Sequence, residues 1–166
     1  MSAAPSIATN PLFDKAVINA FIDGVVKTLG TMANTTVITG KPYIEPNVQM
    51  KGDIAGLLGM TAHPLKGTLV LAFPTEAICL IYQNMLGEET KELTNEVADS
   101  VGELTNMIYG SAKTTLSQLG YKLDMAIPTV IKGNFTIQVK DKSPALVVPF
   151  ELPNKSIFFV QITVST

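Results

Sequence analysis

The fold is decided by the stretch Asp99-Ser100-Val101-Gly102-Glu103-Leu104-Thr105-Asn106-Met107-Ile108-Tyr109-Gly110. Apolar residues recur through it at spacings of three and four, which is the period of a helix with one buried face. This apolar stripe consists of Val97, Val101, Leu104, Ile108, Ala112, Leu116 and Leu119. Thr94 or Asn95 suits a helix start and Gly120 a helix stop. The stretch therefore predicts a long helix that ends near Leu119.

A polar stripe with the same spacing is turned away from the apolar one. It consists of Asp99, Glu103, Asn106, Gly110 and Lys113. Most such stripes are only solvated helix surface. Asn and Gly are nevertheless unfavourable inside a helix, where Gly costs about 1 kcal/mol relative to Ala. Gly110 also allows another backbone to approach closely. The stripe is therefore either plain solvated surface or a surface that carries a carboxylate and a carboxamide into another protein's active site.

The first part of the chain predicts a second long helix followed by strands. Asn10 and Pro11 suit the cap and the first position of a helix that extends to about Met32. Its apolar positions are Phe13, Val17, Ala20, Phe21, Val25, Leu29 and Met32. Strands are predicted at residues 35–41, 48–60 and 67–73. A short helix over residues 76–86 is expected to follow, capped by Thr75 and ended by Gly87.

Three further strands are predicted after the second long helix. They cover residues 127–139 with a break at Gly133, residues 145–152, and residues 156–165, with a hairpin turn at Pro153-Asn154. The middle strand of the first set contains Gly52, Gly56 and Gly59, whose spacing fits neither the dinucleotide fingerprint nor the P-loop. We interpret these glycines as marks of a bent or bulged strand.

The order of elements repeats, since each half has a long helix and three strands. This predicts an α+β fold with an internal pseudo-twofold, in which helices pack on a largely antiparallel sheet. The 166 residues are expected to form a single domain, residues 1–166, with a flexible segment at 1–9. The last predicted strand is rich in strand-forming residues. If it lies at a sheet edge it requires a cover, for which pairing with a second copy is one solution.

Composition argues against several classes of function. The net charge is −2 and all twelve cations are Lys, so neither nucleic acid nor a membrane is an expected partner, and no arginine finger can be supplied. One Cys and one His exclude an intrachain disulfide and a Cys/His metal cluster. Cys79 is expected to be a small buried apolar residue, and His63 a loop residue. No stretch reaches transmembrane length or resembles a leader, so a cytoplasmic location is expected.

Residues 102–113 resemble the signature helix of the CheC/CheX chemotaxis phosphatases. That family's pattern is an Asp or Ser, then Glu after three residues, Asn after two more, and a Pro a little over twenty residues later. Asp99, Glu103, Asn106 and Pro128 match it. Residues 128–133, residues 67–74 and Asn10-Pro11-Leu12-Phe13 are also similar to the family. CheC-like members have two such helices and CheX-like members have one.

The first long helix lacks a second Glu and Asn pair. Alignment of Pro42 with Pro128 sets Val17 opposite Glu103 and Ala20 opposite Asn106. The chain therefore resembles a CheX-like member, which implies a homodimer in which the sheets join.

The resemblance implies hydrolysis of the aspartyl phosphate on a CheY-like response regulator. Asn106 would orient the attacking water and Glu103 would pair with the regulator's active-site Lys, while Asp99 and Gly110 would contact the partner. The chain itself would bind no cofactor, and Mg²⁺ is expected on the regulator. The alternative is a non-catalytic domain that binds a regulator or resembles a motor-switch protein. A self-contained hydrolase that uses His63 or Ser100 is disfavoured, because no partner for a lone His is evident.

Overall fold

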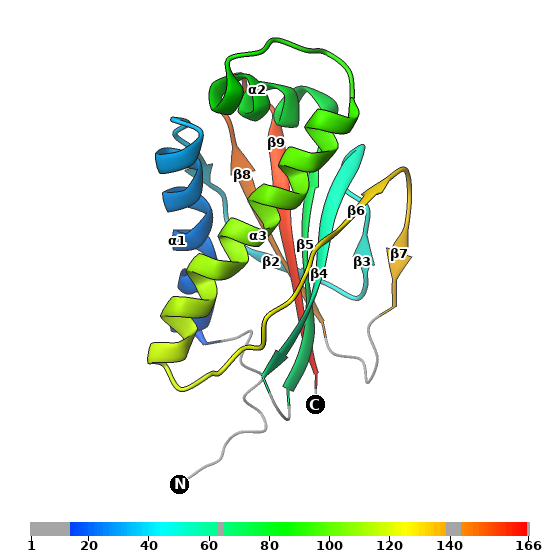
Figure 1. Cartoon of the computed structure of the whole chain (residues 1–166). Helices are drawn as coiled ribbons and strands as arrows, with labels where there is room; N and C mark the ends of the chain where they lie inside the picture. The colour runs from blue at the N-terminus through cyan, green and yellow to red at the C-terminus, as the bar shows by residue number, and fades with distance from the viewer. Residues whose placement is uncertain (1–13, 63–64, 139–143, 166) are drawn as a thin grey trace, which may run out of the picture.

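Two long helices, α1 and α3, lie across one face of an antiparallel sheet, and the shorter α2 covers one end (Figure 1). The computed structural model describes residues 14–62, 65–138 and 144–165. The helices are α1 (Lys15–Met32), α2 (Thr75–Leu86) and α3 (Asn95–Gln118). The strands are β1 (Ile38–Thr39), β2 (Tyr43–Glu45), β3 (Val48–Gln49), β4 (Ile54–Ala62), β5 (Leu65–Phe73), β6 (Thr129–Lys132), β7 (Thr136–Ile137), β8 (Ala145–Glu151) and β9 (Ile157–Ser165).

The strand order confirms the predicted pseudo-twofold. It is β1-β8-β9-β5-β4-β6, with β2 also paired to β8. Exchanging β1–β2 with β6, β4 with β8, and β5 with β9 gives the same order read from the opposite edge of the sheet. The first strand of each half pairs with the other half, since β1 and β2 join β8 while β6 joins β4. The two halves are therefore one interlocked α+β unit over the described residues.

The last strand is not an edge strand, so the condition under which it would require a cover does not arise. β9 lies inside the sheet, with β8 on one side and β5 on the other. Every second residue of this strand faces the helices, and Phe158 stacks between Phe73 and Phe150 with ring centroids 5.1 and 5.2 Å apart. The apolar run is thus explained, because β9 is paired along both of its edges and its helix-facing side chains are buried. The free edges of the described sheet are those of β1–β2 and β6.

Several predicted strands are shorter than expected. The segment at 35–41 holds only β1, and the segment at 48–60 is divided into β3 and β4 by residues 50–53. β2 was not predicted. The break at Gly133 is confirmed, since this residue has φ +98° and separates β6 from β7. β3 and β7 pair with each other as a separate ribbon, shown beyond β4 and β6 in Figure 1.

Helix ends agree with the sequence only in part. Thr94 caps α3 by accepting the amide of Val97 at 3.2 Å, as predicted. The described part of α1 begins at Lys15, where Asp14 accepts the amide of Ala16, while Asn10 and Pro11 lie outside the described residues. Thr75 is not the cap of α2. It is the first helical residue, and its amide and hydroxyl both donate to the carboxylate of Asp53.

The C-terminal ends of the helices also agree with the sequence only in part. Gly87 ends α2 in the left-handed conformation with φ +76°, as predicted. Leu119 is 45% exposed and Met32 is 52% exposed, so neither belongs to a buried stripe. Met32 is the last residue of α1 and Leu119 is the C-cap of α3, so both lie at the frayed end of a helix. The remaining described members of the two predicted stripes are buried.

Close packing explains Gly56 of β4 and Gly52 just before it, whereas a Cβ on Gly59 would meet nothing within 4 Å. β4 pairs with β5 without interruption from Ile54 to Ala62, so it contains no bulge. A Cβ on Gly56 would lie 2.0 Å from the hydroxyl oxygen of Thr105 on α3. A Cβ on Gly52 would lie 2.4 Å from the carbonyl carbon of Phe73. Gly56 therefore lets α3 approach the sheet.

Candidate functional site

The two faces of α3 are separated as the sequence predicts. Val97, Val101, Leu104, Ile108, Ala112 and Leu116 are buried, and Ser100, Thr105 and Tyr109 join them. Asp99, Glu103, Asn106 and Gly110 are exposed, while Lys113 is half-buried. The polar set therefore shares one outward surface of α3. The buried residues of the same helix pack against the sheet and against α1.

Glu103 and Asn106 are three residues apart, which places their Cβ atoms roughly 5–6 Å apart on the same helix face. Within the described part of the chain, neither side chain makes a hydrogen bond or an ion pair, and the same holds for Asp99. The hydroxyls of Ser100 and Thr105, in contrast, donate to helix carbonyls at 2.7 and 2.8 Å. The carboxylate and carboxamide are thus free to engage a group from outside.

The helix that presents these groups is held on several sides. Thr105 packs into the space left by Gly56, and Gly24 of α1 lies against the backbone at Ile108. The hydroxyl of Tyr109 donates to the carbonyl of Asp124. The ammonium of Lys132 donates to the carbonyl of Leu93, just before the helix cap, at 3.1 Å. These contacts fix the position of α3, which is what a preorganised site requires of its scaffold.

Gly110 serves no packing purpose within the part of the chain that the structure describes. A Cβ at this position would meet nothing within 4 Å, and the residue does not have a positive φ. The backbone therefore does not need glycine here, although glycine lowers helix stability by about 1 kcal/mol relative to Ala. The bare helix surface one turn beyond Asn106 is available to an approaching partner.

The first helix holds no second site, but the residue equivalence expected from Pro42 and Pro128 is wrong. Val17 and Ala20 are buried, whereas Glu103 and Asn106 are exposed, so these positions cannot correspond. The burial patterns of α1 and α3 agree when Val17 is set against Val101 and Ala20 against Leu104. Asn19 and Ile22 then stand opposite Glu103 and Asn106. A Glu and Asn pair is absent from α1 under either alignment.

The other candidate nucleophiles and bases are unsuitable. The hydroxyl of Ser100 is buried and bonded to the carbonyl of Val97. Cys79 is buried as predicted, and burial raises the pKa of its thiol. His63 lies outside the described residues. Among the described residues, no three His, Cys, Asp or Glu side chains are grouped closely enough to hold a metal ion.

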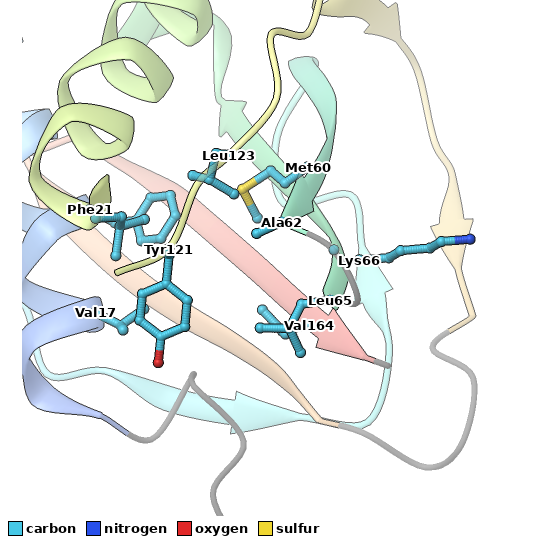
Figure 2. A pocket seen from close by; sticks show the side chains of 11 residues that line it. Val17, Phe21, Met60, Ala62, Leu65, Lys66, Tyr121, Leu123 and Val164 are labelled. Carbon is cyan, nitrogen blue, oxygen red and sulfur yellow. The ribbon is translucent and has the colours of Figure 1, made fainter. Parts of the chain in front are cut away.

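The cavities of the molecule lie away from the polar face of α3. Figure 2 shows an apolar cavity of about 50 Å³ below the helices, lined among others by Val17, Phe21, Tyr121 and Leu123. The ammonium of Lys66 points away from it in this view. A wider cleft, of about 570 Å³, lies at the start of α2, where Asp53 is already bonded to Thr75. The residues that line these two spaces include neither Glu103 nor Asn106.

An exposed acid and an exposed amide thus lie on one face of a packed helix within a pseudo-twofold α+β fold. The family model described as "Chemotaxis phosphatase CheX" matches residues 54–151, more than half of the chain. The chain belongs to the CheX family. No curated protein sequence matches it.

Solved structures agree with this assignment. A CheC-like superfamily protein from Shewanella sp. PV-4 is 38% identical, with a TM-score of 0.85, and the match covers 93% of this chain and 100% of that one. The chemotaxis protein CheX from Vibrio vulnificus is 35% identical, with a TM-score of 0.81 over 90% and 99% of the two chains. The CheX of a CheX-CheY-BeF3-Mg complex from Borrelia burgdorferi is 25% identical, with a TM-score of 0.74 over 90% and 98%.

Sequence reasoning missed the residues that hold the helix in place. The contact of Tyr109 with Asp124 depends on the path of the connection after α3, which has no local sequence signal. The contact of Gly56 with Thr105 had a signal, because a glycine inside a strand often marks a close backbone approach. The sequence analysis favours a bend or a bulge at this glycine, whereas the structure shows a close approach of α3.

Proposed function

We propose that this protein removes the phosphoryl group from the aspartate of a CheY-like response regulator. The observation that carries the proposal is the pair Glu103 and Asn106, exposed and unbonded to described residues on the outward face of a fixed helix. A carboxamide both donates and accepts, so Asn106 can hold a water molecule in line with the phosphorus. Glu103 is suited to pair with the lysine of the regulator's active site.

The chemistry asks little of the phosphatase, because an acyl phosphate is already activated. Water attacks phosphorus, the bond from phosphorus to the aspartyl oxygen breaks, and inorganic phosphate leaves a free carboxylate on the regulator. Positioning of the water and electrostatic stabilisation account for catalysis of this kind. Asn106 supplies the positioning, while the regulator supplies Mg²⁺ and the positive charge. This division suits a chain without arginine.

Asp99 and Gly110 complete the contact surface in this proposal. Asp99 lies one turn before Glu103 and orients the carboxylate-bearing end of the helix toward the regulator's cations. Gly110 removes the side chain one turn beyond Asn106 and lets the regulator's backbone approach. The contact of Glu103 with lysine is partly desolvated on docking, so it contributes more than an ion pair in open solvent.

The complex of the Borrelia burgdorferi relative contains CheX together with CheY, BeF3 and Mg. It supports a regulator as the partner of this chain, and we propose that the two meet in the cytoplasm. We also propose a homodimer that forms at the β1–β2 edge. Ile38, Tyr43 and Ile44 on this edge are 63%, 41% and 55% exposed. Ile44→Lys is expected to shift the species in light scattering from dimer to monomer.

The test of the activity is the lifetime of phosphate on receivers from the same cell, each with and without this protein. Acceleration on at least one receiver supports the proposal, and Glu103→Ala should then weaken both binding and rate. Binding of a receiver without any change in phosphate lifetime would instead identify the non-catalytic interaction domain.

A further inference from the structure

The connection between α3 and β6 carries the two most exposed large apolar side chains among the described residues. Met125 is 89% exposed and Ile127 is 90% exposed. The residues between and around them face the protein, since Leu123 and Ala126 pack against the core and Pro128 is half-buried. The backbone thus directs these two apolar side chains outward, side by side along one short segment.

This segment is fixed against the flank of α3, as Figure 1 shows for the connection that leads up to β6. The amide of Asp124 donates to Thr61 at 2.9 Å, and its carbonyl accepts the hydroxyl of Tyr109. Six residues later, Val130 lies 3.4 Å from the position of a Cβ on Gly102. The segment therefore runs antiparallel to the helix between the levels of residues 109 and 102. Ile127 comes between those levels, beside the turn that carries Asn106.

We propose that Met125 and Ile127 form an apolar rim that contacts the receiver domain when α3 engages it. The inference rests on the proposed function and adds the contacts that set affinity and choice of regulator. The segment that carries the rim is ordered by hydrogen bonds and contacts α3 at Tyr109 and Gly102, within one turn of Asn106 and Glu103. Docking therefore buries apolar area without a cost for ordering this backbone.

The chemistry of the rim complements that of the polar face. Charged contacts such as Glu103 with lysine mainly direct the encounter, whereas buried apolar contacts near the centre of an interface account for much of the affinity. Met is unbranched and adapts to an uneven partner surface. The apolar residues of the β1–β2 edge lie at the opposite edge of the sheet from β6, so a second copy docked there leaves the rim free for a regulator.

The experiment compares wild type with Met125→Ser/Ile127→Ser in two measurements. One is the affinity for a beryllofluoride-activated regulator, and the other is the dependence of the dephosphorylation rate on regulator concentration. The double variant should bind about 10- to 100-fold more weakly, because each side chain loses part of its burial. Its half-saturation concentration should rise by the same factor, with the maximal rate within about twofold. Met125→Leu/Ile127→Val should restore the affinity.

Leu86→Ser is the matched control, because Leu86 is 58% exposed at the end of α2, which lies at the opposite end of the molecule from the start of the segment (Figure 1). It should leave both measurements unchanged. Unchanged affinity in the double variant, or conversion of a dimer to a monomer, would overturn the proposal for the rim. If wild type neither binds nor dephosphorylates any receiver, the proposed function itself fails and the rim fails with it.

Discussion

The helix α3 approaches the sheet closely at Gly56, and Gly56→Ala tests how tightly the site-bearing helix is held. The added Cβ would lie 2.0 Å from the Thr105 hydroxyl oxygen and 3.0 Å from the Thr105 Cβ. Thr105 is fully buried in the middle of α3, so it has no open space into which it can turn. Relief requires α3 to move off β4. Overpacking of this kind costs about 1–3 kcal/mol, and we expect the upper end of that range.

The assay is urea denaturation followed by circular dichroism, from which the free energy of unfolding is obtained. Gly59→Ala is the matched control on the same strand, because its Cβ would meet nothing within 4 Å. That control should change the unfolding free energy by less than about 0.5 kcal/mol. The Thr105→Ala background removes the hydroxyl from the clash, so the cost of Gly56→Ala should fall there by about 1 kcal/mol or more. Equal stability of Gly56→Ala and Gly59→Ala would refute the packing argument.

Two further predictions concern groups that burial perturbs. Burial, followed by the nearby Asp124 carboxylate, raises the pKa of Tyr109 above its ordinary value of 10.0, so the folded protein keeps this proton at a pH where the unfolded chain loses it. Stability should therefore fall as pH rises above about 10, and Tyr109→Phe should reduce that fall while costing about 1 kcal/mol at pH 7; an unchanged alkaline fall in chemical denaturation would contradict this. Burial likewise raises the pKa of the Cys79 thiol, which is 8% exposed, so Ellman's reagent should label the folded protein at least tenfold more slowly than the urea-unfolded chain. Equal labelling rates would show that the thiol is accessible.

The sequence predicted those features of the fold that follow from local periodicity. The two long helices, the repeat of elements and the two faces of α3 all depend on spacings that are visible within about twenty residues. The cap at Thr94 and the stops at Gly87 and Gly133 were also correct, because each depends on the residue itself. The order of elements predicted the α+β class and the internal pseudo-twofold, whereas the pairing of strands between the two halves was not predicted.

Features that depend on tertiary placement were not predictable. The sequence of β9 describes a strand-forming run, and the same run suits an edge or an interior position. Thr is a residue type that often caps helices. Here, however, the carboxylate of Asp53, just before β4, accepts the amide and hydroxyl of Thr75. The residue alignment of α1 with α3 was wrong, because matching prolines in the loops does not determine which residues of each helix face the core.

The candidate site divides in the same way. Glu103 and Asn106 were singled out from their spacing, and the structure places both on the exposed face. Their exposure follows from the buried stripe behind them, which the sequence contains. The surroundings of the pair, including Tyr109, Gly56 and the segment with Met125 and Ile127, depend on chain connections. They emerged only in three dimensions.

The most direct test of the account is the decay of the regulator's aspartyl phosphate in a single turnover, measured at a saturating concentration of the Asn106→Ala protein. If Asn106 holds the attacking water, the decay should be at least about 100-fold slower than with wild type, a loss of about 2.7 kcal/mol of transition-state stabilisation. Binding to the activated regulator should persist. Asn95→Ala is the control, since this exposed Asn lies eleven residues earlier on the same helix and about 16 Å away. Decay with Asn106→Ala as fast as with wild type would contradict the central claim.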